Sequence, residues 1–180
     1  LEVEKNGILN PKKLEEAITK DTLLVTVMHS NNEIGTLQPT KEISEIAKKH
    51  KIAFHTDACQ SVNSEDMKEI KADLLSLNGS KIYGPKGVGI LYKKEGIRIE
   101  PLIHGGGQEF NLRSGTENIP NIVGLAKALE LAQNDKENYK EKLTPLRDYL
   151  IENLLKIENT ILNGDKKNRL PNNINITFLN

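Results

Sequence analysis

"ADLLSLNGSKIYGPKG", residues 72–87, joins an apolar run to a polar, glycine-rich turn that carries Lys81. The apolar run is typical of a buried β-strand. A lysine in such a turn has three interpretations: a solvated loop residue, a phosphate-binding residue, or a reactive amine. The Gly-Lys-Ser/Thr ending of a P-loop is missing, because Pro85 precedes Lys86 and Gly87 follows it. A P-loop is therefore excluded, and the other two interpretations depend on the rest of the chain.

Strand and helix patterns alternate along the chain. The expected strands are 22–30, 51–57, 72–77, 87–94 and 173–178. The spacing of apolar residues predicts a helix over 39–50 with Thr40 as its N-cap, another beginning near Asn118, and a further one across 140–158. This order predicts an α/β fold with a largely parallel sheet and helices on both faces.

Composition and charge exclude several classes of protein. Lys plus Arg and Asp plus Glu are 25 each, and this zero net charge argues against a nucleic-acid or anionic-membrane partner. No run approaches the ~20 apolar residues of a membrane span. Cys59 is the single cysteine, so no internal disulfide forms and a reducing, cytoplasmic location is expected. No cluster at zinc-like spacing is present, so no metal site is expected.

Polar segments follow three of the expected strands. They are "HSNNEIG" (29–35), "DACQS" (57–61) and "NGSK" (78–81). Ligands of such sheets bind beyond the carboxyl ends of the strands, so these segments are expected to converge on one rim. Asp57 is then either a turn carboxylate or an acceptor for a cationic ring nitrogen. A Schiff-base lysine, here Lys81, together with an acid at a pyridinium nitrogen, is the arrangement that pyridoxal phosphate requires.

Five motifs, in order, carry a resemblance to a known family. They are "MHSNNEIGTLQP", "HTDACQS", "SKIYGPKGVGILY", "HGGGQE" and "RSGTEN". Together they resemble cysteine desulfurases of the NifS/IscS group, which are class V aminotransferase-fold enzymes dependent on pyridoxal 5'-phosphate. The resemblance implies a PLP-dependent transferase of fold type I. Residues 1–135 would form part of the large cofactor-binding domain, without its N-terminal portion, and 136–180 the incomplete start of a smaller α+β C-terminal domain.

The resemblance also implies roles for individual residues. Lys81 matches the lysine that forms the Schiff base and later moves protons at Cα, and Asp57 matches the partner of the pyridine nitrogen. Gln60 matches a donor to the phenolic oxygen of the cofactor. Asn32 matches a residue on the phenolate side that also helps to orient the substrate. Thr116 matches a threonine contributed to the phosphate site of the neighbouring subunit, which implies a homodimer.

Two positions depart from the family pattern. The family has His directly before the Schiff-base lysine and Ser two residues earlier, and both contact the cofactor phosphate. Here Ser80 and Asn78 stand at those positions. A hydroxyl and a carboxamide can each donate a hydrogen bond to phosphate, so both residues are predicted to bind the cofactor with changed contacts. His104 and Arg113 receive no role.

Cys59 is expected to be structural. It lies between Asp57 and Gln60, in the floor of the expected site, and burial raises the pKa of a thiol. In the family, the persulfide-forming cysteine lies on a mobile loop of the C-terminal part, beyond the sequence given. The chain also begins without Met and stops inside a strand pattern. It is therefore expected to be a fragment that does not desulfurate cysteine by itself.

The function implied by the resemblance is conversion of L-cysteine to L-alanine, with transfer of the sulfur as an enzyme persulfide. That sulfur would serve iron–sulfur cluster assembly or tRNA thiolation through an acceptor or scaffold protein. Two alternatives stay open. One is another class V enzyme, such as a selenocysteine lyase or an aminotransferase, and the other is a non-catalytic scaffold that binds partner proteins.

Overall fold

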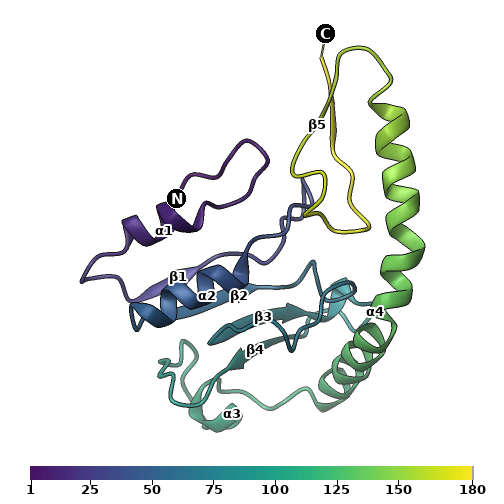
Figure 1. Ribbon diagram of the computed structural model, residues 1–180. Coiled ribbons are helices and arrows are strands. Elements are labelled where there is room, and N and C mark those ends of the chain that lie inside the picture. The colour runs from purple at the N-terminus through teal and green to yellow at the C-terminus, as the bar shows by residue number, and fades with distance from the viewer. Residues whose placement is uncertain (180) are drawn as a thin grey trace.

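A four-stranded sheet in the order β1-β2-β3-β4 forms the centre of the computed structural model, which describes residues 1–179. Strands β1, β2 and β3 run parallel, and β4 is antiparallel to β3 (Figure 1). The strands are β1 (Leu24–Thr26), β2 (Ala53–Asp57), β3 (Leu74–Asn78) and β4 (Gly89–Lys93). Each overlaps its predicted range, and the predicted α/β fold with a largely parallel sheet is confirmed.

The helices and a smaller sheet complete the chain. They are α1 (Pro11–Ala17), α2 (Thr40–Lys49), the 3₁₀ turn η1 (Gly79–Lys81), α3 (Gln108–Asn111), α4 (Ile119–Leu154), β5 (Thr160–Leu162) and β6 (Ile176–Phe178). Strands β5 and β6 form an antiparallel pair beyond the end of α4, at the top of Figure 1. Among residues 1–179, no helix is both long and apolar enough to cross a membrane.

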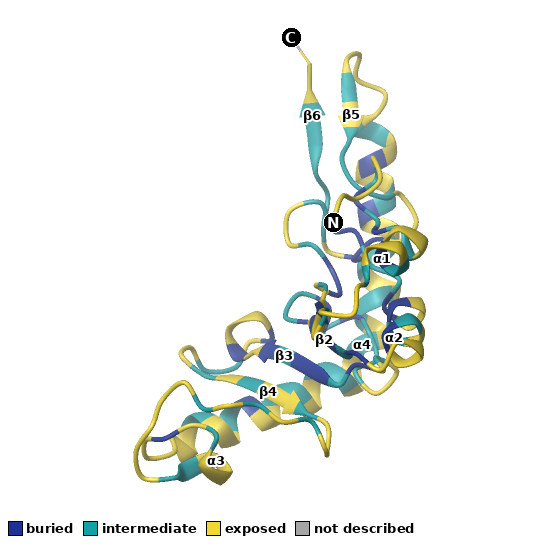
Figure 2. Ribbon diagram, turned by 90° about the vertical axis from the view of Figure 1, so that its left-hand side faces the viewer, coloured by how far each residue is buried: buried dark blue, intermediate teal, exposed yellow. Residues whose placement is uncertain are grey.

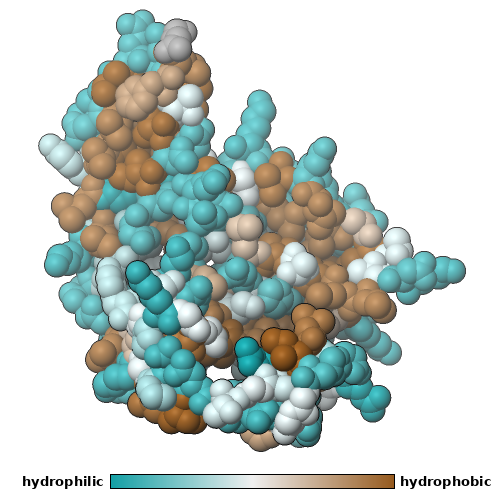
Figure 3. Space-filling model, turned by 180° about the vertical axis from the view of Figure 1, so that it is seen from behind, coloured by the Kyte–Doolittle hydropathy of each residue, from teal (hydrophilic) through white to brown (hydrophobic). Residues whose placement is uncertain are grey.

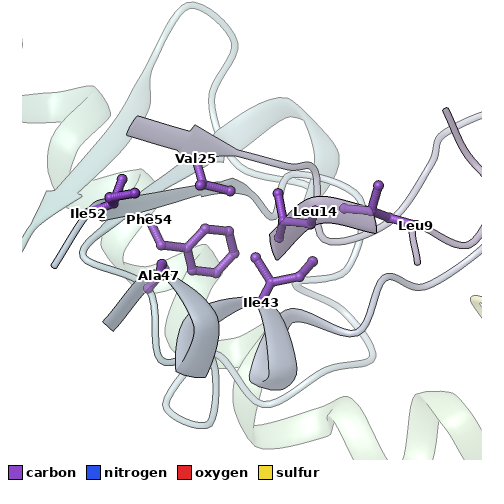
Figure 4. Close-up of a cluster of buried hydrophobic side chains, with 8 residues drawn as sticks. Leu9, Leu14, Val25, Ile43, Ala47, Ile52 and Phe54 are labelled. Carbon is purple, nitrogen blue, oxygen red and sulfur yellow. The ribbon is translucent and has the colours of Figure 1, made fainter. Parts of the chain in front are cut away.

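One cluster of buried side chains packs α1 and α2 against β1 and β2 (Figure 4). Ile43 and Ala47 are four residues apart on α2 and therefore point to the same side of the helix. Phe54, on β2, is 1% exposed and lies among them. The buried members are Leu9, Leu14, Val25, Ile43, Ala47, Ile52, Phe54 and Ala72. This cluster fixes β2, the strand that ends at Asp57.

A second cluster packs α4 against β3 on the same face of the sheet. Phe54 and Thr56 share a face because alternate residues of a strand do, and Thr56 pairs in register with Leu75. The buried members are Ala58, Val62, Leu75, Leu77, Ile82 and Leu125. Both α2 and α4 therefore cover one face, and Asp57 projects from the other. The prediction of helices on both faces of the sheet is wrong for residues 1–179, because the apolar side chains of β2 and β3 that pack on helices alternate onto a single face.

Helix α4 is longer than the sequence predicts. One 36-residue helix replaces the two helices expected near Asn118 and across 140–158, so the predicted break is wrong. The polar stretch around residue 136 is rich in Lys and Glu, which are good helix formers, and it carries no helix-breaking residue. Pro145 lies inside the helix and removes one backbone donor, and Figure 1 shows α4 changing direction along its length. The domain boundary between residues 135 and 136 stays a prediction and falls inside this helix.

Thr40 does not cap α2, contrary to the prediction. The cap position is occupied by Pro39, which makes no side-chain hydrogen bond to the helix, and Thr40 is the first helical residue. Proline satisfies the dihedral requirement at a helix start without a hydroxyl. The side chain of Thr40 is buried instead, with the residue 8% exposed.

Two parts of the molecule expose apolar side chains. The upper part of α4 and the β5–β6 pair form an apolar surface in Figure 3. Leu146 of α4 and Phe178 of β6 are 60% and 59% exposed. The loop around α3 is also exposed, in contrast to the buried β3 (Figure 2). It carries Leu102 and Phe110, which are 95% and 90% exposed.

Candidate cofactor site

Three polar segments meet beyond the carboxyl ends of the parallel strands. The backbone N–H of His29 donates to the carbonyl of Asp57 at 2.7 Å, which continues the pairing of β1 with β2. The N–H of Ala58 donates to the carbonyl of Ser76 at 3.0 Å, which continues the pairing of β2 with β3. The predicted convergence of segments 29–35, 57–61 and 78–81 on one rim is therefore confirmed.

Asp57 is the last residue of β2, and its side chain is exposed. Its Oδ1 accepts a hydrogen bond from the backbone N–H of Cys59 at 2.9 Å, which turns the chain away from the strand. Its Oδ2 accepts no hydrogen bond from residues 1–179. Asp57 is thus a turn carboxylate that keeps one oxygen free for a ligand. Its role as an acceptor for a ring nitrogen stays a prediction.

Lys81 ends the 3₁₀ turn η1, directly after β3. The turn needs Gly79, because a Cβ there would lie 2.8 Å from the carbonyl oxygen of Pro85. The amide of Asn63 donates to the Lys81 carbonyl at 3.0 Å and ties the turn to the segment after β2. The Lys81 side chain is exposed and has no hydrogen bond or ion pair within the described residues. The rim therefore carries a free primary amine.

Asn78 and Ser80 are joined by two hydrogen bonds. Asn78 Oδ1 accepts from the backbone N–H of Ser80 at 2.9 Å and from its hydroxyl at 2.8 Å, which caps η1. The Asn78 amide N–H groups remain available to an anion, whereas the Ser80 hydroxyl would have to turn away from Asn78. Both residues line an open pocket together with Lys86, Gly87, Val88 and Gly89. Their contact with a phosphate stays a prediction.

Lys86 is a candidate anion ligand that the sequence did not assign. The antiparallel pairing of β4 with β3 places Gly89 opposite Asn78, and this brings the preceding turn back beside the end of β3. Lys86 lines the same pocket as Asn78 and Ser80. A hairpin pattern after β3 would have been the signal in the sequence, because it returns the turn to the same rim.

The two asparagines of the 29–35 segment have different roles. Asn31 Oδ1 accepts from the N–H groups of Glu33 and Ile34, at 2.9 and 3.0 Å, and so holds the turn closed. The turn ends at Gly35, whose φ of 71° lies in the left-handed region that favours glycine. Asn32 is exposed, and its side chain makes no hydrogen bond within residues 1–179. Asn32 is therefore the residue of the pair with an amide free for a ligand.

Gln60 and Thr116 differ in their placement. Gln60 is half-buried in the turn that follows Asp57, on the same rim. Thr116 is exposed in the loop between α3 and α4, which is held by a hydrogen bond from the Gly115 N–H to Gln108 Oε1 at 2.9 Å. Within the described part of the chain, no hydrogen bond joins Thr116 to the rim. The cofactor roles of both residues stay predictions.

His29 and Ser61 lock two of the converging segments together. His29 Nδ1 and Ser61 Oγ lie 2.7 Å apart, and both residues are buried. Loss of solvent disfavours the imidazolium and lowers the pKa of His29 to about 4. The rim therefore rests on a neutral histidine.

We expect the protein to lose stability as the pH falls from 6.5 to 4. The unfolded chain takes up a proton on His29 near pH 6.5, whereas the folded protein does so only near pH 4. Above pH 6.5 His29 is neutral in both states, so its burial does not reduce the free energy of unfolding. By pH 4 the unfolded chain has gained the proton, and about 3 kcal/mol of the free energy of unfolding is lost. Urea unfolding across this pH range measures it, and His29→Gln should flatten the slope. An unchanged slope in that variant would contradict the assignment.

Cys59 has an unreactive environment. Loss of solvent, followed by the neighbouring Asp57 carboxylate, raises the pKa of its thiol to about 12. The positive charge of Lys81 acts in the opposite direction, with a smaller effect. At neutral pH the thiol is therefore protonated and is a poor nucleophile.

We expect Cys59→Ser to leave turnover of the holoenzyme unchanged. The wild-type thiol should react with iodoacetamide about 10³-fold more slowly at neutral pH than a free thiol, in proportion to its thiolate fraction. Peptide mass spectrometry of the labelled protein measures this rate. Rapid labelling of Cys59, or loss of turnover in the serine variant, would contradict its structural role.

Comparison with known proteins now gives the family. The family model for class-V aminotransferases matches residues 1–180. The chain belongs to the class-V aminotransferase family. A cysteine desulfurase IscS of Methanosarcina thermophila is 53% identical over 180 residues, which cover 99% of this chain and 45% of that protein. The chain therefore spans about half the length of the curated relatives it matches.

Two solved structures share the fold of this chain. A NifS-like protein superposes with a TM-score of 0.91 at 37% identity, over 98% of this chain and 49% of that one. SspA in complex with cysteine gives a TM-score of 0.79 at 38% identity, over 99% of this chain and 50% of that one. The resemblance to the NifS/IscS group and fold type I are thus confirmed.

The cofactor of this family is pyridoxal 5'-phosphate. Its aldehyde needs a primary amine, its pyridine nitrogen an acid, and its phosphate several hydrogen-bond donors. The free amine of Lys81 and the free oxygen of Asp57 meet the first two requirements. Asn78 and Lys86 supply donors in one pocket. The residues present therefore fit the cofactor. Among residues 1–179, no three His, Cys, Asp or Glu side chains are grouped so as to hold a metal ion.

Proposed function

We propose that the protein carrying this chain is a cysteine desulfurase that uses pyridoxal 5'-phosphate to convert L-cysteine to L-alanine and passes the sulfur on as an enzyme persulfide. The observation that carries the proposal is the unpaired amine of Lys81 on the same rim as the free carboxylate oxygen of Asp57. The choice of cysteine as substrate is supported by the similarity to cysteine desulfurases over nearly the whole chain.

Each residue of the rim has a separate task in this function. When bound, the cofactor supplies an electron sink for bonds broken at the substrate Cα. Asp57 holds the proton on the ring nitrogen, and Lys81 binds the aldehyde through its amine and moves the proton at Cα. Gln60 would donate to the phenolic oxygen of the cofactor, and Asn32 would lie on the phenolate side and help to orient the substrate. Both side chains are neutral amides, which can donate to an oxygen of the cofactor or the substrate.

The phosphate of the cofactor is assigned to the pocket at the β3–β4 turn. Asn78 and Ser80 would donate through neutral groups, since Ser80 stands where the family has histidine. Lys86 lines the same pocket and adds a positive charge. Every hydrogen bond to an ionised phosphate is charge-assisted, and the ammonium of a lysine adds a full opposite charge to it. Lys86 therefore offsets part of what the two departures from the family pattern remove.

A homodimer is part of the proposal. It is supported by the exposed loop around α3, where Thr116 lies at the surface and Leu102 and Phe110 are almost fully exposed. A second subunit would cover these apolar side chains and receive Thr116 at its phosphate site. We also propose a cytoplasmic location and a sulfur-acceptor or scaffold protein as partner, in iron–sulfur cluster assembly or tRNA thiolation.

The function is tested by adding L-cysteine and excess dithiothreitol to the holoenzyme and measuring released alanine and sulfide, since the dithiol reduces the enzyme persulfide and is itself oxidised to a disulfide. Alanine and sulfur in equal amounts are expected, together with a visible absorbance band from the bound cofactor. A bound cofactor without alanine formation would point to another class V activity, such as a selenocysteine lyase or an aminotransferase. Neither a band nor alanine would point to a non-catalytic scaffold. Either result would overturn the proposal.

A further inference from the structure

The turn that carries Asn32 is wrapped by a distant part of the chain, residues 163–175, which we name the C-terminal strap. Thr36 forms an isolated antiparallel bridge with Arg169. The N–H of Leu37 donates to the Asn168 carbonyl at 2.9 Å, and the N–H of Leu170 donates to the Gly35 carbonyl, also at 2.9 Å. The strap therefore follows the turn along its length rather than touching it at one point.

Within the strap, Asn173 reaches the backbone of Asn32 itself. Its Nδ2 donates to the carbonyl oxygens of Asn32 and Glu33, at 3.2 and 3.1 Å. Asn175 Nδ2 donates to the Glu33 carbonyl at 3.2 Å. The approach is close, because a Cβ at Gly35 would lie 2.5 Å from Asn173 Oδ1. Only glycine in the turn leaves room for this amide.

The orientation of the Asn173 amide is set by Arg169. Arg169 Nη1 donates to Asn173 Oδ1 at 3.1 Å, so the oxygen faces the guanidinium and the NH₂ group faces the turn. Arg169 is 3% exposed and also donates to the carbonyls of Asp165 and Asn163. Because the guanidinium has no acceptor lone pair, an amide flipped the other way would lose this bond.

We propose that Asn173 is a positioning residue that sets the place of Asn32 at the cofactor. The strap holds the Asn32 backbone through the oriented amide, Asn31 closes the turn from within, and the Asn32 side chain is left free to face a ligand. The expected effect of Asn173 on catalysis rests on the proposed function. The tethering of the turn stands on the contacts themselves.

The substitution Asn173→Asp separates positioning from folding. Aspartate keeps the size of the side chain and its acceptor for Arg169, but it cannot donate to the Asn32 and Glu33 carbonyls. Asn168→Asp is the matched control, because Asn168 is exposed on the same strap and its side chain makes no hydrogen bond within residues 1–179. Thermal unfolding of both variants shows whether each is folded.

Hydrogen exchange of the holoenzyme is the first measurement. In Asn173→Asp the amides of residues 33–35 should exchange about tenfold faster or more, the change expected for the loss of two hydrogen bonds. The Asn168→Asp control should exchange like the wild type. Equal exchange in the two variants would overturn the tether, whether or not the protein desulfurates cysteine.

The second measurement is a double-mutant cycle with Asn32→Ala. Asn173→Asp alone should lower kcat/KM for L-cysteine about tenfold and shift the visible band of the cofactor, whereas in the Asn32→Ala background it should have no further effect. Suppose instead that exchange is faster but Asn173→Asp still lowers kcat/KM tenfold in the Asn32→Ala background. The strap would then hold the turn without acting through Asn32, and the positioning role would be overturned. An inactive wild-type protein would refute the proposed function and leave the exchange result standing.

Discussion

Replacing Lys81 with alanine is expected to lower cysteine turnover of the holoenzyme by at least roughly 10³-fold, because acid–base catalysis by a positioned side chain is worth about 10²–10⁴-fold. The same change removes the amine that binds the cofactor aldehyde. The Lys81 side chain is exposed and makes no hydrogen bond or ion pair within residues 1–179, so its removal leaves no buried group without a partner. The steady-state rate of alanine release measures the effect.

The control for this variant is Lys48→Ala, which removes an exposed lysine near the C-terminal end of α2. The chain enters β2 from there, so this end of the helix lies at the opposite end of the strand from Asp57. It should turn over cysteine like the wild type. A Lys81→Ala enzyme within tenfold of the wild type would show that the amine on this rim is not the reactive one.

Asp57→Asn is expected to lower turnover about 10²–10³-fold, the size of effect seen when one preorganised electrostatic partner is removed. An amide cannot keep the ring nitrogen protonated. The fold should persist, because the Asn side-chain oxygen can still accept from the Cys59 N–H, as Asp57 Oδ1 does. Turnover and thermal unfolding are measured together, with the exposed Asp21→Asn as control. Near-normal turnover with the fold intact would contradict the role of Asp57.

The ends of β2 and β3 are well predicted by the sequence, since a buried strand requires a local apolar run. β2 illustrates this: its buried residues alternate up to the exposed Asp57, and the carboxylate falls where the predicted strand stops. Lys81 follows β3 in the same way. Local pattern therefore places both central groups on one rim. By contrast, β1 ends at Thr26 and not at residue 30, and the short edge strand β5 is not predicted.

Features that depend on helix continuity or turn geometry are predicted less well. The stretch around residue 136 is polar and solvated, yet Lys and Glu continue α4 through it as readily as apolar residues would. The hydrogen bonds between Asn78 and Ser80 depend on the backbone dihedral angles of η1, which the sequence alone does not specify. The same holds for Asn31, whose capping bonds separate it from Asn32.

The strap could not be predicted at all from local pattern. Asn173 and Asn32 are separated by 141 residues, and the bond between them joins an amide to a backbone carbonyl. Neither group leaves a periodic or compositional trace in the sequence. Only the folded structure shows that the C-terminal strap holds the turn that carries Asn32.

The most direct test of the central claim, that Lys81 carries the cofactor, is chemical reduction of the holoenzyme with sodium borohydride. Reduction fixes the cofactor covalently to the amine that binds its aldehyde, and fragmentation of the labelled peptide by mass spectrometry identifies the residue. Lys86 is the built-in comparison, since it lies five residues further on in the same turn. We predict that the mass of the reduced cofactor appears on Lys81. Its appearance on Lys86 or on any other lysine would contradict the account.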